Sequence, residues 1–213
     1  MPFTAEEFFA VFAAYNRALW PLPLVTELLG LLAAALLLVR PPWASRAVAG
    51  ILAILWLLVG GGYHLAFFTA INPMAHAFGA MFLVQGALLA WTGAWQGAWR
   101  LEPVSGAQGW LAGLLGFYAL VVYPLMGLLA THPYPGTPLF GMAPCPTAIF
   151  TLAVLLLSTD GPPWRLTAIP LAWAGIGGSA AMLLGVLQDY GLIVAGLLVL
   201  GATLHPSGAR TAS

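Results

Sequence analysis

The sequence contains no lysine and one cysteine, and only 6% of its 213 residues are charged. A chain without lysine cannot form a Schiff base with retinal or pyridoxal, and it cannot build a Walker A phosphate-binding loop. One cysteine excludes an internal disulfide bond, an iron–sulfur cluster and a zinc site made of paired cysteines. The formal net charge is zero, which gives no reason to expect nucleic acid as a partner.

Apolar residues, in contrast, make up 62% of the sequence, and the mean hydropathy is +0.96. A water-soluble domain of this size cannot bury so much apolar surface. We therefore expect an all-α membrane protein in contact with the lipid bilayer, with one transmembrane domain over residues 1–213. Seven apolar segments predict a seven-transmembrane-helix bundle within residues 20–205, followed by a cytoplasmic tail at 206–213. These segments are residues 20–39, 46–70, 74–99, 108–131, 146–159, 165–186 and 190–205.

The first 19 residues have the pattern of a short amphipathic helix. Thr4 and Glu7 have the spacing of a capping box, in which each side chain bonds the backbone amide of the other residue. Phe8, Phe12 and Tyr15 follow at helical spacing and share one face. The pattern predicts a helix that lies in the membrane interface or folds over the protein.

Residues 132–147, HPYPGTPLFGMAPCPT, contain five prolines and are called the proline-rich segment below. Proline lacks an amide hydrogen and does not continue a helix interior. The apolar run that follows, residues 148–157, has ten residues, whereas about 20 are needed to cross a bilayer. The fifth helix can therefore span only if the proline-rich segment is partly re-entrant. Irregular backbone at membrane depth requires protein or water to satisfy its polar groups, which predicts a protein-lined cavity beside it.

Arginine placement predicts the orientation. With seven spans, all the arginines except Arg17 fall at one end of the bundle, namely Arg40, Arg46, Arg100, Arg165 and Arg210. Positive residues gather on the cytoplasmic side, so we expect a bacterial inner-membrane protein with its N-terminus outside and its C-terminus inside. The patterns Gly93-x-x-x-Gly97 and Gly109-x-x-x-Gly113 predict close helix packing, and such Gly-rich faces are suited to a homo-oligomer.

Most other polar residues fall in the outer half of the predicted bundle, and an outward-facing polar cavity would explain this bias. Ionisable groups inside a membrane usually face a partner or a wet cavity. Glu27 is the candidate proton or cation carrier, His64 its polar partner, and the helix start at Cys145 an anion or soft-metal contact. The predicted cavity residues are Glu27, Tyr63, His64, Gln85, Tyr123, Cys145, Gln188 and Asp189. The first hypothesis is a protein that binds or transports a small ligand or ion, with no catalytic residue assigned.

Two alternatives stay open. A membrane enzyme or redox subunit would hold a metal or haem at histidines or at a soft site with Cys145. Its candidate ligands are His64, His76, His132, Met142 and Cys145, although the histidines differ in predicted depth and form no HxxxH or HExxH pattern. The other alternative is a non-catalytic membrane assembly partner. The sequence favours a protein that is not an enzyme, and its composition names no ligand or cofactor.

Three stretches also carry a resemblance. They are residues 3–20 (FTAEEFFAVFAAYNRALW), 63–86 (YHLAFFTAINPMAHAFGAMFLVQG) and 132–150 (HPYPGTPLFGMAPCPTAIF). Together they resemble a family of small bacterial polytopic inner-membrane proteins catalogued as a domain of unknown function. The resemblance implies several membrane spans and transfers no activity, so no residue role is taken from it.

Overall fold

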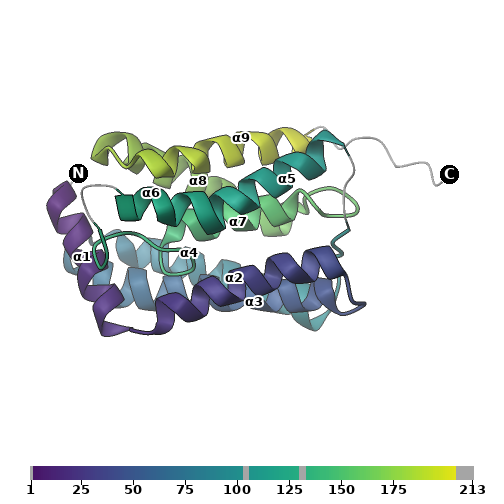
Figure 1. Ribbon diagram of the computed structural model, residues 1–213, viewed down its shortest axis with the longest axis horizontal. Coiled ribbons are helices and arrows are strands. Elements are labelled where there is room, and N and C mark those ends of the chain that lie inside the picture. The colour runs from purple at the N-terminus through teal and green to yellow at the C-terminus, as the bar shows by residue number, and fades with distance from the viewer. Residues whose placement is uncertain (1, 103–105, 130–132, 205–213) are drawn as a thin grey trace.

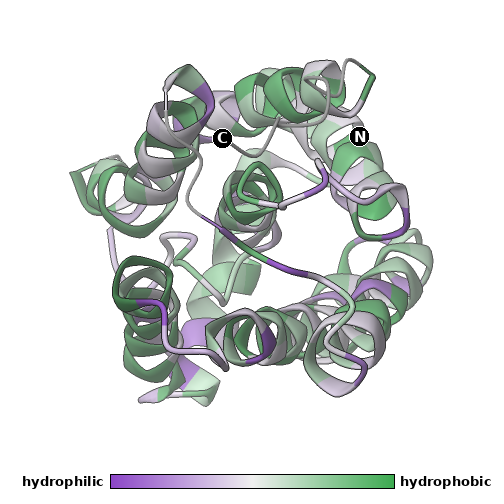
Figure 2. Ribbon diagram, turned by 90° about the vertical axis from the view of Figure 1, so that its right-hand side faces the viewer, coloured by the Kyte–Doolittle hydropathy of each residue, from purple (hydrophilic) through white to green (hydrophobic). Residues whose placement is uncertain are grey.

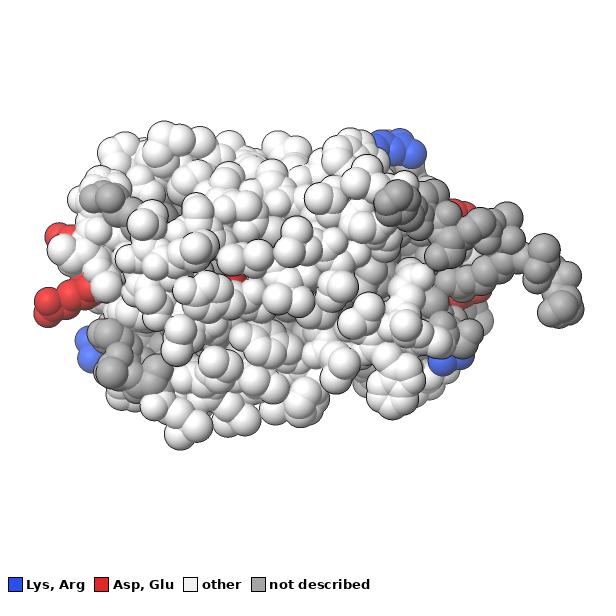
Figure 3. Space-filling view, turned by 90° about the horizontal axis from the view of Figure 1, so that it is seen from above, with Lys and Arg blue, Asp and Glu red and all other residues white. Residues whose placement is uncertain are grey.

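The computed structural model describes residues 2–102, 106–129 and 133–204, and this part of the chain is helical without any β-strand. The helices form an elongated bundle, with α1 lying across one end (Figure 1). Charged side chains gather at the two ends, and the band between them is almost free of charge (Figure 3). This distribution is typical of a protein whose middle lies in hydrocarbon.

Among the described residues, six helices are long and apolar enough to cross a membrane. Several of them contain turns of wider π-helix or tighter 3-10 helix. They are α2 (Leu22–Val39); α3 (Ala44–Leu58) continued by η1 (Val59–Phe67) and η2 (Phe68–Ala70); α4 (Ala75–Leu88) with η3 (Leu89–Trp95); α5 (Ala107–Phe117) with η4 (Tyr118–Val122) and α6 (Tyr123–Leu129); α8 (Trp164–Leu184); and η5 (Leu187–Asp189) with α9 (Tyr190–Leu204). The predicted all-α fold is thereby confirmed, and six of the described helices fit the predicted membrane protein by their length and composition.

The fifth predicted segment forms α7 (Pro144–Leu155), which has 12 residues, and every one of them is buried. Viewed along the bundle, this helix lies at the centre and the others surround it (Figure 2). It contacts α3, α5, α8 and α9. Its polar side chains are satisfied: Trp56 Nε1 donates to Thr151 Oγ1 at 2.9 Å, and Thr151 Oγ1 donates to the carbonyl of Thr147 at 2.8 Å. The short helix is thus the core of the bundle.

The predicted N-terminal helix is confirmed as α1 (Ala5–Ala18), and it begins with the predicted capping box. Thr4 Oγ1 accepts from the Glu7 amide at 3.2 Å, and the Thr4 amide donates to Glu7 Oε2 at 2.7 Å. Its inner face is buried against the bundle, with Phe12 stacked on Tyr63 at a centroid distance of 4.6 Å. Burial raises the pKa of the Tyr15 hydroxyl on the same face, because desolvation disfavours the charged form. The helix therefore folds over the protein.

The described part of the proline-rich segment is irregular from residue 133 to 143 and becomes buried from Thr137 onward. Its carbonyls are satisfied by side chains of the first two helices. Asn16 Nδ2 donates to Pro135 O at 2.8 Å and to Thr137 O at 2.9 Å. Thr26 Oγ1 donates to Phe140 O at 2.9 Å. These bonds hold irregular backbone inside the bundle, as buried polar groups require.

The first predicted glycine pattern serves packing within the chain. A Cβ on Gly93 would collide with Ala49, and one on Gly97 would collide with the Arg46 side chain. Gly113 of the second pattern behaves differently, because a Cβ there would meet no described atom within 4 Å. The space beside Gly113 belongs to a groove considered below.

Candidate functional site

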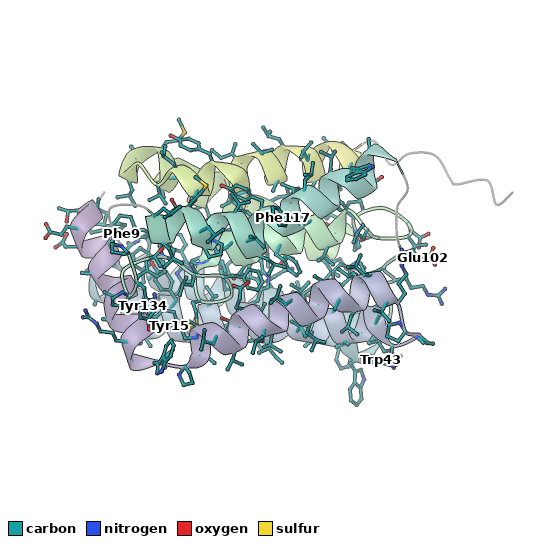
Figure 4. The ribbon with its side chains drawn as sticks, in the orientation of Figure 1. Phe9, Tyr15, Trp43, Glu102, Phe117 and Tyr134 are labelled. Atoms are coloured by element: carbon teal, nitrogen blue, oxygen red, sulfur yellow. The ribbon has the colours of Figure 1, made fainter. Side chains whose placement is uncertain are left out.

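A cavity of about 240 Å³ lies under α1, at the end of the bundle where Figure 4 labels Phe9, Tyr15 and Tyr134. Its walls come from α1, η1, η2, α4, α6, α8, η5 and the start of α7. We call it the α1 cavity. Because α7 begins at Pro144, within the proline-rich segment, its first turn forms part of the cavity wall.

Asp189 is the central acidic group of the α1 cavity, and its side chain is 4% exposed. Tyr123 Oη donates to Asp189 Oδ1 at 2.5 Å. The Cys145 thiol donates to the same carboxyl group and also lies beside the Trp173 indole. Cys145 is the second residue of α7, and a helix N-terminus favours a nearby negative charge. The carboxylate is thus held by two donors at the buried end of a helix.

Tyr63 and His64 enter the cavity from η1, a π-helical stretch at the end of the second span. The π-helix is rare, and its turns occur frequently at functional sites. The Tyr63 ring lies between Phe12 and Phe68, with centroid distances of 4.6 and 5.3 Å. The His64 ring meets the edge of Trp173 at 5.3 Å. Consecutive residues of one helix therefore both reach the same cavity.

Three polar atoms of these two residues have no hydrogen-bond partner among the described residues: Tyr63 Oη and both ring nitrogens of His64. Tyr63 is 1% exposed and His64 is fully buried. A buried polar group without a partner costs about 1–3 kcal/mol. A molecule that enters the cavity and forms hydrogen bonds with these atoms would remove this free-energy cost.

The remaining lining is strongly aromatic and lacks basic groups. No lysine or arginine occurs among the described lining residues. Eight aromatic rings line the cavity, namely Phe3, Phe8, Phe12, Tyr63, Phe68, Phe78, Tyr123 and Trp173. The α1 cavity thus combines aromatic walls with a single carboxylate.

The structure brings together five of the eight predicted cavity residues: Tyr63, His64, Tyr123, Cys145 and Asp189. Their role as ligand contacts stays a prediction.

The other three lie outside the lining of this cavity. Glu27 is half-buried on α2. Gln188 is buried beside Asp189, and its carbonyl accepts from Tyr118 Oη at 2.6 Å. Gln85 Nε2 donates to the carbonyl of Leu166 at 2.9 Å. Their predicted depth in the bundle was the basis for grouping them with the cavity, and the structure places all three outside its lining.

Sequence reasoning missed Trp173 and the phenylalanines of α1 as cavity residues. Trp173 lies near the middle of α8, away from the interfacial positions where tryptophan is common in membrane proteins. A buried tryptophan usually finds a hydrogen-bond partner for its N–H, so a tryptophan in the middle of a span was the sequence signal that could have indicated this site. Phe8 and Phe12 were assigned only to the amphipathic face.

The metal candidates do not converge. Among the described residues, no group of three or more histidine, cysteine, aspartate or glutamate side chains could hold a metal ion. His76 is exposed, with Nδ1 at 3.1 Å from the Pro73 carbonyl. Met142 is fully buried in the core beside the start of α7. His132 lies outside the described residues. The described residues therefore contain no cluster of three such ligands for a metal ion, and the haem alternative stays a hypothesis.

The fold and the cavity define a class: a polytopic helical membrane protein with a buried aromatic cavity under its N-terminal helix. Residues 5–209 match the family of unknown function DUF6064. The chain belongs to this family, and the predicted membership in a domain family of unknown function is confirmed. No curated protein and no solved structure matches the chain.

Proposed function

We propose that this membrane protein binds a small organic cation in the α1 cavity. The observation that carries the proposal is the set of unpartnered polar atoms on Tyr63 and His64, placed beside the Asp189 carboxylate within aromatic walls. The Asp189 carboxylate attracts positive charge, and aromatic faces attract a cation within about 6 Å of the ring centroid.

The size of the cavity limits the ligand. About 240 Å³ corresponds to roughly eight water molecules at ~30 Å³ each. This volume suits a small primary or quaternary amine better than a drug-sized compound, because ligand pockets of that kind measure about 300–1,000 Å³. His64 and Tyr63 would bond the polar part of the ligand, and the rings would surround its cationic part.

The same proposal includes the finer topology. The proline-rich segment and α7 together form a seventh, partly re-entrant crossing, and the bonds from Asn16 and Thr26 to its carbonyls support it. With seven crossings, the arginine distribution supports an orientation in which α1 lies outside a bacterial inner membrane. The α1 cavity then faces outward.

Ligand binding is tested by thermal unfolding of the detergent-purified protein with choline or with its neutral carbon isostere, dimethylbutanol. A ligand at 100 times its Kd stabilises the folded state by about 2.7 kcal/mol. We expect choline to raise the unfolding temperature and dimethylbutanol to leave it unchanged. Equal effects of the two compounds, or no effect of any small amine in a wider series, would overturn the proposal.

Two conservative variants locate the site. Asp189→Asn keeps an acceptor for the Tyr123 hydroxyl and removes the charge, and Tyr63→Phe removes one unpartnered oxygen. Both should weaken choline binding at least tenfold. Tyr118→Phe is the matched control, because its hydroxyl bonds the Gln188 carbonyl and it does not line the cavity. Binding that is lost equally in the control would show that the effect is not local.

A further inference from the structure

A second hollow, larger than the α1 cavity, lies between α2 and α5 near the opposite end of the bundle. Its volume is about 880 Å³. Figure 1 shows α2 and α5 on the near face with α7 behind them. The floor is formed by Phe150, Ala153 and Val154 of α7, and the walls include Leu31 and Leu38 of α2 and Gly113 and Phe117 of α5. We call it the α2–α5 groove.

The mouth of the groove is charged, whereas its interior is apolar. Arg40, Arg46 and Arg100 line the mouth together with one acidic residue, Glu102, so the formal charge there is three minus one, or +2. Arg40 Nε donates to the Leu37 carbonyl and Arg46 Nη2 to the Gln96 carbonyl, each at 3.4 Å. A guanidinium carries five N–H donors and binds phosphate in a fork, so these two long bonds use a small part of the available donors.

The length of the groove matches one leaflet of a bilayer. Along α2 it extends from Leu31 to Arg40, which is nine steps of 1.5 Å, or about 14 Å. Half of the roughly 30 Å hydrocarbon thickness is about 15 Å. The charged end of the groove therefore lies at headgroup level when its apolar end lies near the bilayer midplane.

We propose that the α2–α5 groove binds one membrane phospholipid with an anionic headgroup. One acyl chain lies along the groove against Phe150 and Val154, and the headgroup phosphate binds Arg40, Arg46 and Arg100. The apolar walls select an acyl chain, and the net positive mouth selects a negative headgroup over a zwitterionic one. This lipid fills the space that α2 and α5 leave open over the central helix.

The test is native mass spectrometry of the delipidated full chain, titrated with phosphatidylglycerol or phosphatidylcholine that have identical acyl chains. We expect one phosphatidylglycerol per chain, bound at least tenfold more tightly than phosphatidylcholine. Changing Arg40, Arg46 and Arg100 together to glutamine should reduce this preference to less than twofold. Arg17→Gln, which lies on α1 at the other end, is the charge control and should keep the preference.

A steric variant tests the acyl-chain part. Gly113→Phe places an aromatic ring in the groove, and the new Cβ itself meets no described atom within 4 Å. It should lower the affinity for phosphatidylglycerol at least tenfold. Gly201→Phe on α9 is the matched control, since a Cβ there is equally unobstructed and the residue does not line the groove. Thermal unfolding of both variants checks that they fold.

Three results would overturn the proposal. Equal lipid binding by Gly113→Phe and Gly201→Phe would place the lipid elsewhere. Displacement of the lipid by millimolar inorganic phosphate would indicate a headgroup-only contact with no chain in the groove. A homodimer of the delipidated wild type that Gly113→Phe disrupts would identify a second copy of the chain as the occupant.

Discussion

Gln85 provides the sharpest test of how the bundle satisfies its buried backbone. Pro170 lies inside α8, and it has no amide hydrogen to donate to the carbonyl four residues earlier. That carbonyl belongs to Leu166, and it accepts from Gln85 Nε2 of α4 at 2.9 Å in a buried position. The Gln85 side chain therefore replaces the helical hydrogen bond that Pro170 removes. We predict that Gln85→Leu destabilises the protein for this reason and not through the α1 cavity.

The expected loss of stability in Gln85→Leu depends on both polar atoms of the side-chain amide, the donor Nε2 and the acceptor Oε1. Leaving the Leu166 carbonyl buried without its partner costs about 1–3 kcal/mol. Gln85 Oε1 is buried and has no partner among the described residues, so leucine removes one unsatisfied atom while it creates another. The two penalties offset each other, and we expect a net loss of about 0.5–1.5 kcal/mol, the net contribution of the hydrogen bond itself. For a chain of this size, 1 kcal/mol corresponds to a shift of about 2–4 °C in the unfolding temperature.

The assay is a double-mutant cycle with Pro170→Ala, followed by thermal unfolding in detergent. Alanine restores an amide at residue 170, which can bond the Leu166 carbonyl within α8. In that background, Gln85→Leu should cost about 1 kcal/mol less than in the wild type, as expected for residues that share one partner. If the two changes are additive within about 0.3 kcal/mol, Gln85 does not substitute for the missing amide and the reasoning fails.

Two further predictions concern the proline-rich segment. Asn16→Asp keeps the shape of the side chain and replaces its donor by a carboxylate oxygen that faces two carbonyls. It should destabilise the protein by about 3 kcal/mol, which is more than Asn16→Ala should. Thermal unfolding of the two variants checks this order, and equal stability of Asn16→Asp and the wild type would contradict it. Gly141→Ala should cost more than Gly185→Ala: both glycines have positive φ, +71° and +69°, but a Cβ on Gly141 would lie 2.9 Å from Leu55 Cδ2 whereas one on Gly185 meets no described atom within 4 Å. Urea or thermal unfolding measures both, and equal losses would show that the close packing at Gly141 is unimportant.

The helices could be predicted from the sequence because hydropathy reports which segments avoid water. The predicted segments 46–70 and 165–186 end within two residues of the helices Ala44–Ala70 and Trp164–Leu184. The capping box at Thr4 could also be predicted, because it depends only on two residues that are three positions apart in the sequence. Hydropathy does not report whether an apolar helix faces lipid or protein, so the central position of α7 could not be predicted. Only an indirect indication of that position was present in the sequence, because the fifth apolar segment after the proline-rich segment is too short to cross a bilayer alone.

The site could be predicted only in part, because sequence gives the depth of a residue better than its direction. Asp189 and Tyr123 were found since polar groups inside a membrane need partners. Glu27 was grouped with them by depth, although it lies on a helix that does not line the cavity. The bond between Gln85 and Leu166 depends on α4 and α8 being neighbours, and no local pattern in one sequence carries that information.

The short central helix explains why the bundle has hollows at both of its ends. Twelve residues of α7 extend about 18 Å, whereas the surrounding helices must cover about 30 Å of hydrocarbon. At its N-terminal end the missing length is replaced by irregular backbone, which packs less completely than a helix and leaves the α1 cavity beside Cys145. Toward its C-terminal end, the α2–α5 groove lies against Phe150, Ala153 and Val154 of α7. We therefore expect that lengthening α7 at its N-terminal end would close the α1 cavity.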